Sequence, residues 1–230
     1  MPQTHTDKAF EQDLRSLRDK LLVMGGKVES AIAESMRALT ERDSALAEKV
    51  VESDAEVNRL EVEVDELCRR ILALRQPAAS DLRLITTALK IVTDLERIGD
   101  LAVNIAERVM DLNQAPPLKP YVDLPRLAEL TQGQVRKALD AFVSSDPTKA
   151  SDVLQGDAHV DDLFLKIFNE LLGFMMEDSK NIRRGTSLMS VAKHLERVGD
   201  HATNVAEMVI YMVKGTDIRH PRSRKLDNRG

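Results

Sequence analysis

A six-residue acidic motif occurs twice in this sequence, and its side chains are the ones whose type and spacing could support chemistry. Leu-Glu-Arg-Ile-Gly-Asp spans residues 95–100, and Leu-Glu-Arg-Val-Gly-Asp spans residues 195–200. On a helical wheel of about 100° per residue, the oxygen-bearing side chains of each copy fall on one narrow face, opposite most of the apolar positions. The two faces comprise Glu96, Asp100, Asn104 and Glu107, and Glu196, Asp200, Asn204 and Glu207.

Oxygen ligands of this kind suit hard or borderline cations. Each face is therefore a candidate site for a metal cation, such as iron, Mn²⁺, Mg²⁺, Ca²⁺ or Zn²⁺, and the sequence leaves the metal's identity open. An ordinary solvated helix surface shows the same pattern. Against that interpretation, the like charges of Glu96 and Asp100 disfavour an isolated helix. Gly99 in mid-helix costs about 1 kcal/mol relative to Ala, which suggests the close approach of another group. The residues alone leave both interpretations open.

The preceding helical segment of each half carries acids that could join these faces. In the first half, Asp54, Asn58, Glu61 and Asp65 share one face, so five or more carboxylates would converge if the two segments lie side by side. Such a cluster needs neutralising by cations or by basic side chains. In the second half Asp157 and Asp161 are present, but Phe164 and Phe168 replace the later acids. We therefore expect the second half to hold its metal differently or more weakly. His201 lies off the face and is a marginal candidate.

The elements that must position these residues are six long helices. Apolar residues recur at helical spacing over 14–39, 45–75, 80–109, 124–144, 147–177 and 181–213. Short connections favour antiparallel neighbours, with Ser80 expected as an N-cap and Gly215 as a stop. The only proline-rich linker, 113–120, lies near the middle of the chain. The predicted fold is all-α, with two similar three-helix bundles over residues 1–115 and 116–215 and a disordered tail over 216–230.

An internal duplication relates the two halves. At an offset of 100 residues, a dozen positions of the third and sixth segments are identical, among them Glu96/Glu196, Gly99/Gly199 and Asp100/Asp200. A weaker match at an offset of 103 links Asp54 and Val57 with Asp157 and Val160. Two copies of a period this long indicate a duplicated unit with pseudo-twofold symmetry, not a solenoid.

Composition limits the function classes. The formal net charge is −5, so no overall electrostatic attraction draws the chain to nucleic acid. No apolar run approaches the length of a membrane span, and the first residues lack the apolar core of a signal peptide. The single cysteine, Cys68, excludes a disulfide within one chain and is expected to be buried. We expect a cytoplasmic protein without membrane insertion.

Several segments together resemble the PhoU family. They are the two acidic motifs, Arg75-Gln-Pro-Ala-Ala-Ser-Asp-Leu-Arg83, and the opening Leu22-Val-Met-Gly25-Gly26. The resemblance implies metal ions at Glu/Asp-x-x-x-Asp motifs, here Glu96/Asp100 and Glu196/Asp200. It also implies a homodimer that negatively regulates phosphate uptake and phosphate-starvation signalling. Its implied partners are the transporter ATPase subunit PstB and the sensor kinase PhoR.

Two other function classes stay open beside a regulator. A metal-dependent enzyme would need open coordination positions beside a pocket. No catalytic residues are predicted, because no phosphate-binding loop, nucleophile elbow or His-x-x-x-His pair occurs. A metal-free helical adaptor would leave both acidic faces solvated.

Overall fold

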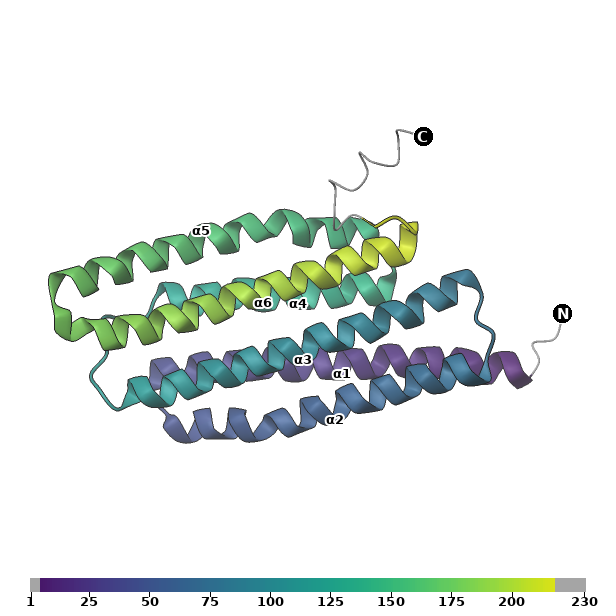
Figure 1. The fold of residues 1–230 in the computed structure, drawn as a ribbon, viewed down its shortest axis with the longest axis horizontal. Helices are drawn as coiled ribbons and strands as arrows, with labels where there is room; N and C mark the ends of the chain where they lie inside the picture. The colour runs from purple at the N-terminus through teal and green to yellow at the C-terminus, as the bar shows by residue number, and fades with distance from the viewer. Residues whose placement is uncertain (1–4, 218–230) are drawn as a thin grey trace.

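The computed structural model describes residues 5–217, and these residues form six long helices and no strand (Figure 1). The bounds are α1 His5–Glu41, α2 Ser44–Leu74, α3 Ala79–Asn113, α4 Asp123–Ser144, α5 Pro147–Glu177 and α6 Ile182–Lys214, with a short 3₁₀ turn, η1, at Ser179–Asn181. The all-α prediction with six helices is confirmed. Most of the tail predicted for 216–230 lies outside the described residues.

Local side chains explain where several helices begin and end. The carboxylate of Asp43 accepts a hydrogen bond from the backbone N–H of Leu46 at the start of α2. Asp146 caps α5 in the same way, with Pro147 in the first turn. Gly215 ends α6 with φ of 68°, a conformation that favours glycine. The expected N-cap at Ser80 is wrong: α3 begins one residue earlier, with Ala78 at the cap position and no side-chain hydrogen bond there.

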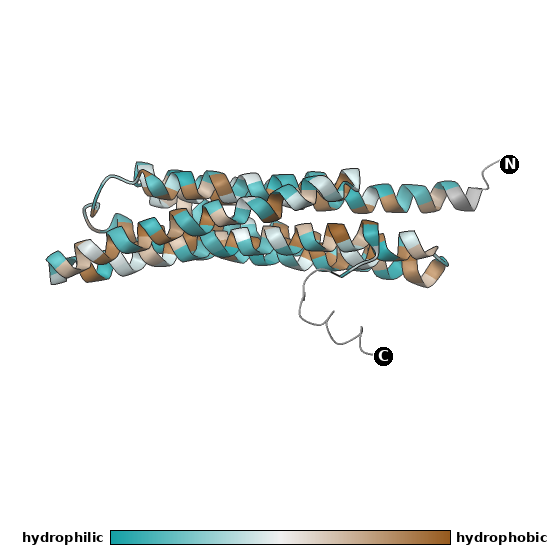
Figure 2. Cartoon of the chain, turned by 90° about the horizontal axis from the view of Figure 1, so that it is seen from above, coloured by the Kyte–Doolittle hydropathy of each residue, from teal (hydrophilic) through white to brown (hydrophobic). Residues whose placement is uncertain are grey.

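Two three-helix units pack against each other, α1–α3 and α4–α6 (Figure 1). Helices α3 and α6 cross the centre of the molecule side by side, and α1 lies against α4. The apolar faces of both units form one continuous buried cluster. Figure 2 shows hydrophobic and hydrophilic residues interspersed along the visible helices, the pattern of amphipathic helices around a shared core. The prediction of two similar three-helix bundles is confirmed; the boundaries proposed at 115 and 215 stay a prediction.

Contacts between the units are specific. Gly25 of α1 faces Leu139 of α4, and the guanidinium of Arg136 donates to the carboxylate of Glu29, with 2.9 Å from Nε to Oε2.

Cys68 is fully buried, as expected. Burial, with a smaller effect of the nearby Asp65, raises the pKa of its thiol to about 12, so the thiol is not a ready nucleophile.

Candidate metal sites on paired helices

The first acidic cluster lies where α2 packs against α3 and consists of Asp54, Glu61, Glu96 and Asp100. Burial is the largest cause that raises the pKa of Glu96. The negative charges of Asp100, Glu61 and Asp54 raise it further. The pKa of Asp54 is also raised, mainly by burial and additionally by Asp100. The two helices therefore bring these four carboxylates near one another, whereas five or more were expected.

One basic side chain partly neutralises this cluster. The guanidinium of Arg97 lies 3.4 Å from a carboxylate oxygen of Glu96 and 3.2 Å from one of Asp100. Because Arg97 is more than half exposed, solvent screens these ion pairs and they contribute little stability. Because Arg97 pairs with only two of the four carboxylates, an excess of negative charge remains between α2 and α3.

The other predicted first-half residues lie beside the cluster. Asn58 donates a hydrogen bond to Asp54 over 2.7 Å. Asp65 forms an ion pair with Arg69 one turn further along α2, over 2.7 Å. Asn104 is half-buried one turn beyond Asp100 on α3.

The second acidic cluster lies between α5 and α6 and consists of Asp157, Asp161, Glu196 and Asp200. Burial raises the pKa of Asp200 most, and the charges of Glu196, Asp157 and Asp161 add to the effect. Burial likewise is the largest cause that raises the pKa of Asp157. The basic side chain here is Lys193, with 2.7 Å between its ammonium and the carboxylate of Glu196, although the residue that aligns with Arg97 is Arg197. The duplication thus repeats the charge arrangement, four carboxylates to one basic group.

The two clusters differ at the positions where sequence analysis found phenylalanine. The rings of Phe164 and Phe168 lie 6.2 Å apart on α5, and the ammonium of Lys193 sits 5.4 Å above the Phe164 ring. At the matching positions α2 carries Glu61 and Asp65. The second cluster therefore has an aromatic edge where the first has acids.

Two polar residues of α6 are turned toward α3. The ring Nδ1 of His201 lies 2.8 Å from a carboxylate oxygen of Asp94, and the amide of Asn204 donates to the same oxygen over 3.4 Å. Asp94 is only 8% exposed, so this pairing fixes α6 against α3. Asn204 was predicted to lie on the acidic face, and its pairing with Asp94 was not predicted, because pairing across helices depends on packing that one helical wheel does not show.

The acidic faces are more covered than the helical wheels predicted. The side chains of Glu96 and Glu196 are only 18% and 13% exposed. The wheels considered one helix at a time, whereas α2 and α5 pack along the edges of α3 and α6. Partial cover by α2 and α5 is therefore an addition to the predicted placement of these glutamates opposite most of the apolar positions.

Each motif glycine permits a close approach, as its mid-helix position suggested. A Cβ on Gly99 would lie 3.2 Å from Val57 and 3.3 Å from Asp54 Oδ1. A Cβ on Gly199 would lie 3.3 Å from Val160 and 3.6 Å from Asp157 Oδ1. The absent side chain therefore lets Asp54 lie close against the backbone at Gly99, whereas at Gly199 it makes room for Val160, with Asp157 at an ordinary contact distance.

The arrangement supplies donors for a cation, although the ligands are not yet gathered around one point. Within residues 5–217, no three His, Cys, Asp or Glu side chains form a group that could hold a metal ion. Eight of the predicted metal residues thus form two clusters of carboxylates, in which Arg97 pairs with Glu96 and Asp100 and Lys193 pairs with Glu196.

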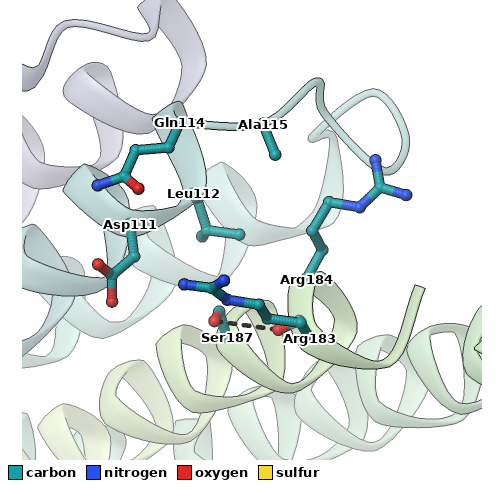
Figure 3. Close-up of a pocket in the computed structure, with 7 residues that line it drawn as sticks. All are labelled: Asp111, Leu112, Gln114, Ala115, Arg183, Arg184 and Ser187. Atoms are coloured by element: carbon teal, nitrogen blue, oxygen red, sulfur yellow. Dashed lines mark hydrogen bonds between the residues drawn. The ribbon is translucent and has the colours of Figure 1, made fainter. Parts of the chain in front are cut away.

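A separate cavity of about 200 Å³ lies where the end of α3 meets the start of α6 (Figure 3). Arg183 and Arg184 line it, but the Arg184 guanidinium is held by the carbonyl of Pro116 and the side chain of Asn181. Asp111 lies on the opposite wall (Figure 3). This cavity contains none of the predicted metal residues.

The fold and the two clusters define a class of protein: a duplicated three-helix bundle with a carboxylate cluster in each half. The PhoU domain matches the chain twice, over residues 21–109 and 124–209. The chain belongs to the PhoU family. Within residues 5–217, no helix has a stretch that is both long and apolar enough to cross a membrane.

Named relatives and solved structures agree with this assignment. The chain is 45% identical over 217 residues to the phosphate-specific transport system accessory protein PhoU homolog of Pseudomonas putida, covering 94% of this chain and 85% of the relative. It is 38% identical over 225 residues to the phosphate-specific transport system accessory protein PhoU of Escherichia coli. That alignment covers 97% of this chain and 92% of the relative. The crystal structure of PhoU from Pseudomonas aeruginosa superimposes with a TM-score of 0.86 at 44% identity, covering 90% of this chain and all of that one.

A more distant solved structure has the same architecture. The phosphate transport system regulatory protein PhoU from Streptococcus pneumoniae is 28% identical and superimposes with a TM-score of 0.83, covering 91% of this chain and 99% of that one. The duplicated bundle is therefore retained at much lower sequence identity.

Proposed function

We propose that this chain is a non-enzymatic accessory protein that negatively regulates phosphate uptake and phosphate-starvation signalling. Relatives that align over nearly its whole length are named as accessory or regulatory proteins of phosphate transport. The structural observation that supports the proposal is the repeated cluster, in which four carboxylates on paired helices lie near one another and a single basic side chain neutralises part of their charge. Because this charge arrangement occurs once in each half, it serves a role that both halves share.

Metal binding is the role that this charge arrangement supports best. The donors are all oxygens, which suits Mn²⁺, Mg²⁺ or iron. Burial and mutual repulsion raise the pKa of Asp54, Glu96, Asp157 and Asp200, so a cation would relieve an existing electrostatic penalty. A bound cation would supply positive charge that cross-links α2 to α3 and α5 to α6. Glu96 and Glu196 would then exchange Arg97 and Lys193 for the metal.

The proposed partners are the transporter ATPase subunit PstB and the sensor kinase PhoR, with this chain acting as a homodimer between them. When phosphate is plentiful, the complex would restrain uptake and keep the starvation response off. We propose a cytoplasmic location, because the ATPase subunit of a transporter acts on cytoplasmic ATP. The long, rigid helices and the carboxylates on their paired faces suit a protein that docks onto others.

Deleting the gene tests the regulatory role. In phosphate-rich medium, a reporter driven by a phosphate-starvation promoter should rise in the deletion strain and fall again when the wild-type gene is returned. An unchanged reporter would contradict the proposed role. Complementation should be weaker with the cluster variant Glu96→Ala/Asp100→Ala/Glu196→Ala/Asp200→Ala than with a control variant that removes exposed acids elsewhere, Glu48→Ala/Asp140→Ala.

Assays of the purified protein address the enzyme alternative. We expect no phosphatase or ATPase turnover with Mn²⁺ or Mg²⁺ present. Turnover that copurifies with the protein and disappears in the cluster variant would replace the regulatory proposal with a metal-dependent enzyme.

A further inference from the structure

A buried amide lies beneath the second acidic cluster. Gln134 of α4 is 6% exposed, and neither of its amide atoms meets a partner in hydrogen-bond geometry. The amide N–H lies toward the carboxylate of Asp157, and this interaction partly offsets the rise in that carboxyl's pKa. Buried amides in proteins are normally fully hydrogen-bonded. The amide oxygen, buried at this depth without a partner, therefore calls for a further interacting group.

The amide oxygen points to the place where the cluster meets the motif helix. The position that a Cβ on Gly199 would occupy lies 3.0 Å from Gln134 Oε1 and 3.6 Å from Asp157 Oδ1. Both oxygens thus lie against the same glycine of α6. Glu196 and Asp200, one turn apart on α6, flank this glycine, and their charges act on Asp157 and on each other.

The first half offers an internal comparison. The corresponding position at Gly99 lies 3.3 Å from Asp54 Oδ1 and 3.2 Å from Val57, as in the second half. The third neighbour there is Val28, at 3.8 Å, where the second half has Gln134. The duplicated unit therefore has an apolar side chain in one copy and an amide oxygen in the other, at the same place beneath the motif glycine.

We propose that Gln134 Oε1 is an additional, neutral ligand for a divalent cation bound at the second cluster. The inference rests on the proposed metal binding. Amide carbonyls are established ligands of hard cations. An amide oxygen adds a donor without adding negative charge to a cluster whose carboxylates already repel one another. It also compensates for the aromatic edge, where Phe164 and Phe168 stand in place of acids. The two halves then bind the same cation with different ligand sets.

Titration with Mn²⁺ tests the proposal in a protein whose first cluster has been removed by Glu96→Ala/Asp100→Ala. Adding Gln134→Met, an apolar side chain of similar length, should lower the Mn²⁺ affinity of the remaining site roughly 10-fold or more in calorimetric titration. Adding Gln134→Glu, which keeps a ligating oxygen, should preserve or increase the affinity. The matched control places Gln134→Met in the mirrored background, Glu196→Ala/Asp200→Ala, where the first-half affinity should not change.

Each outcome decides a separate question. Unchanged Mn²⁺ affinity with Gln134→Met, or equal weakening with Gln134→Met and Gln134→Glu, would overturn the ligand role and leave the proposed metal sites in place. The absence of Mn²⁺ binding in the wild-type chain would overturn both. Circular dichroism distinguishes a lost ligand from a lost fold, because Gln134→Met removes an unsatisfied buried group and should not lower the thermal midpoint.

Discussion

Two adjacent glycines of α1 should respond oppositely to the same substitution. A Cβ on Gly25 would lie 2.1 Å from Leu139 Cδ1, while a Cβ on Gly26 would meet nothing within 4 Å. In mid-helix either Gly→Ala change gains about 1 kcal/mol of helix propensity. At Gly25, displacing the buried Leu139 costs about 1–3 kcal/mol through overpacking. Gly26→Ala should therefore stabilise the protein by about 1 kcal/mol, and Gly25→Ala should be neutral or destabilising.

The difference is large enough to measure. The two variants should differ by about 1–3 kcal/mol in the free energy of unfolding, which for a chain of this size is about 2–12 °C in thermal midpoint. Urea titrations and calorimetry of both variants give the comparison directly. Adding Leu139→Ala to Gly25→Ala should show a favourable coupling energy in a double-mutant cycle. Equal stabilisation by the two glycine substitutions would refute the close packing of α1 on α4.

Three further substitutions test other parts of the structure. The pKa of Asp200 is raised above 3.8 in the folded state, so stability from this group is full below pH 3.8 and falls as the pH rises through the folded pKa. Asp200→Asn should therefore raise the urea midpoint at neutral pH in chelator-treated buffer, unlike the exposed control Asp140→Asn; a lower midpoint would contradict the repulsion. Asp94→Ala should cost about 1–3 kcal/mol, because it leaves His201 without its buried partner; a double-mutant cycle with His201→Ala should show coupling, and additive effects would contradict the pairing. Asp43→Ala should cost about 0.5–2 kcal/mol by removing the N-cap of α2, and an unchanged midpoint in thermal unfolding would contradict that role.

Sequence periodicity predicted the helices well because their packing is repetitive. Apolar residues such as Leu95 and Ile98 recur every three or four positions and are buried in the structure. Turn signals marked the ends, with Gly215 and Pro147 near the positions expected. The error at Ser80 arose because a helix can begin without a side-chain cap, as α3 does at Ala78.

Contacts between side chains far apart in the sequence could not be predicted from it, for a physical reason. Asp94 and His201 are 107 residues apart and meet only because α3 and α6 pack side by side. Gln134 looks like an ordinary polar residue of α4 until the packing of α4 against Gly199 buries it. A wheel drawn for one helix shows which side chains share a face, but not which neighbour covers that face. The close approach at Gly99 was predictable from the sequence, because a glycine in mid-helix by itself indicates that another group lies near the backbone.

Elemental analysis of the purified protein is the most direct test of the central claim, that each half holds a metal site. After loading with Mn²⁺ and removal of free metal, the wild-type chain should retain metal in both halves. Glu96→Ala/Asp100→Ala and Glu196→Ala/Asp200→Ala should each lose the metal of one half, and the combined variant should lose all of it. A metal content that is the same in the wild type and the combined variant would contradict the account.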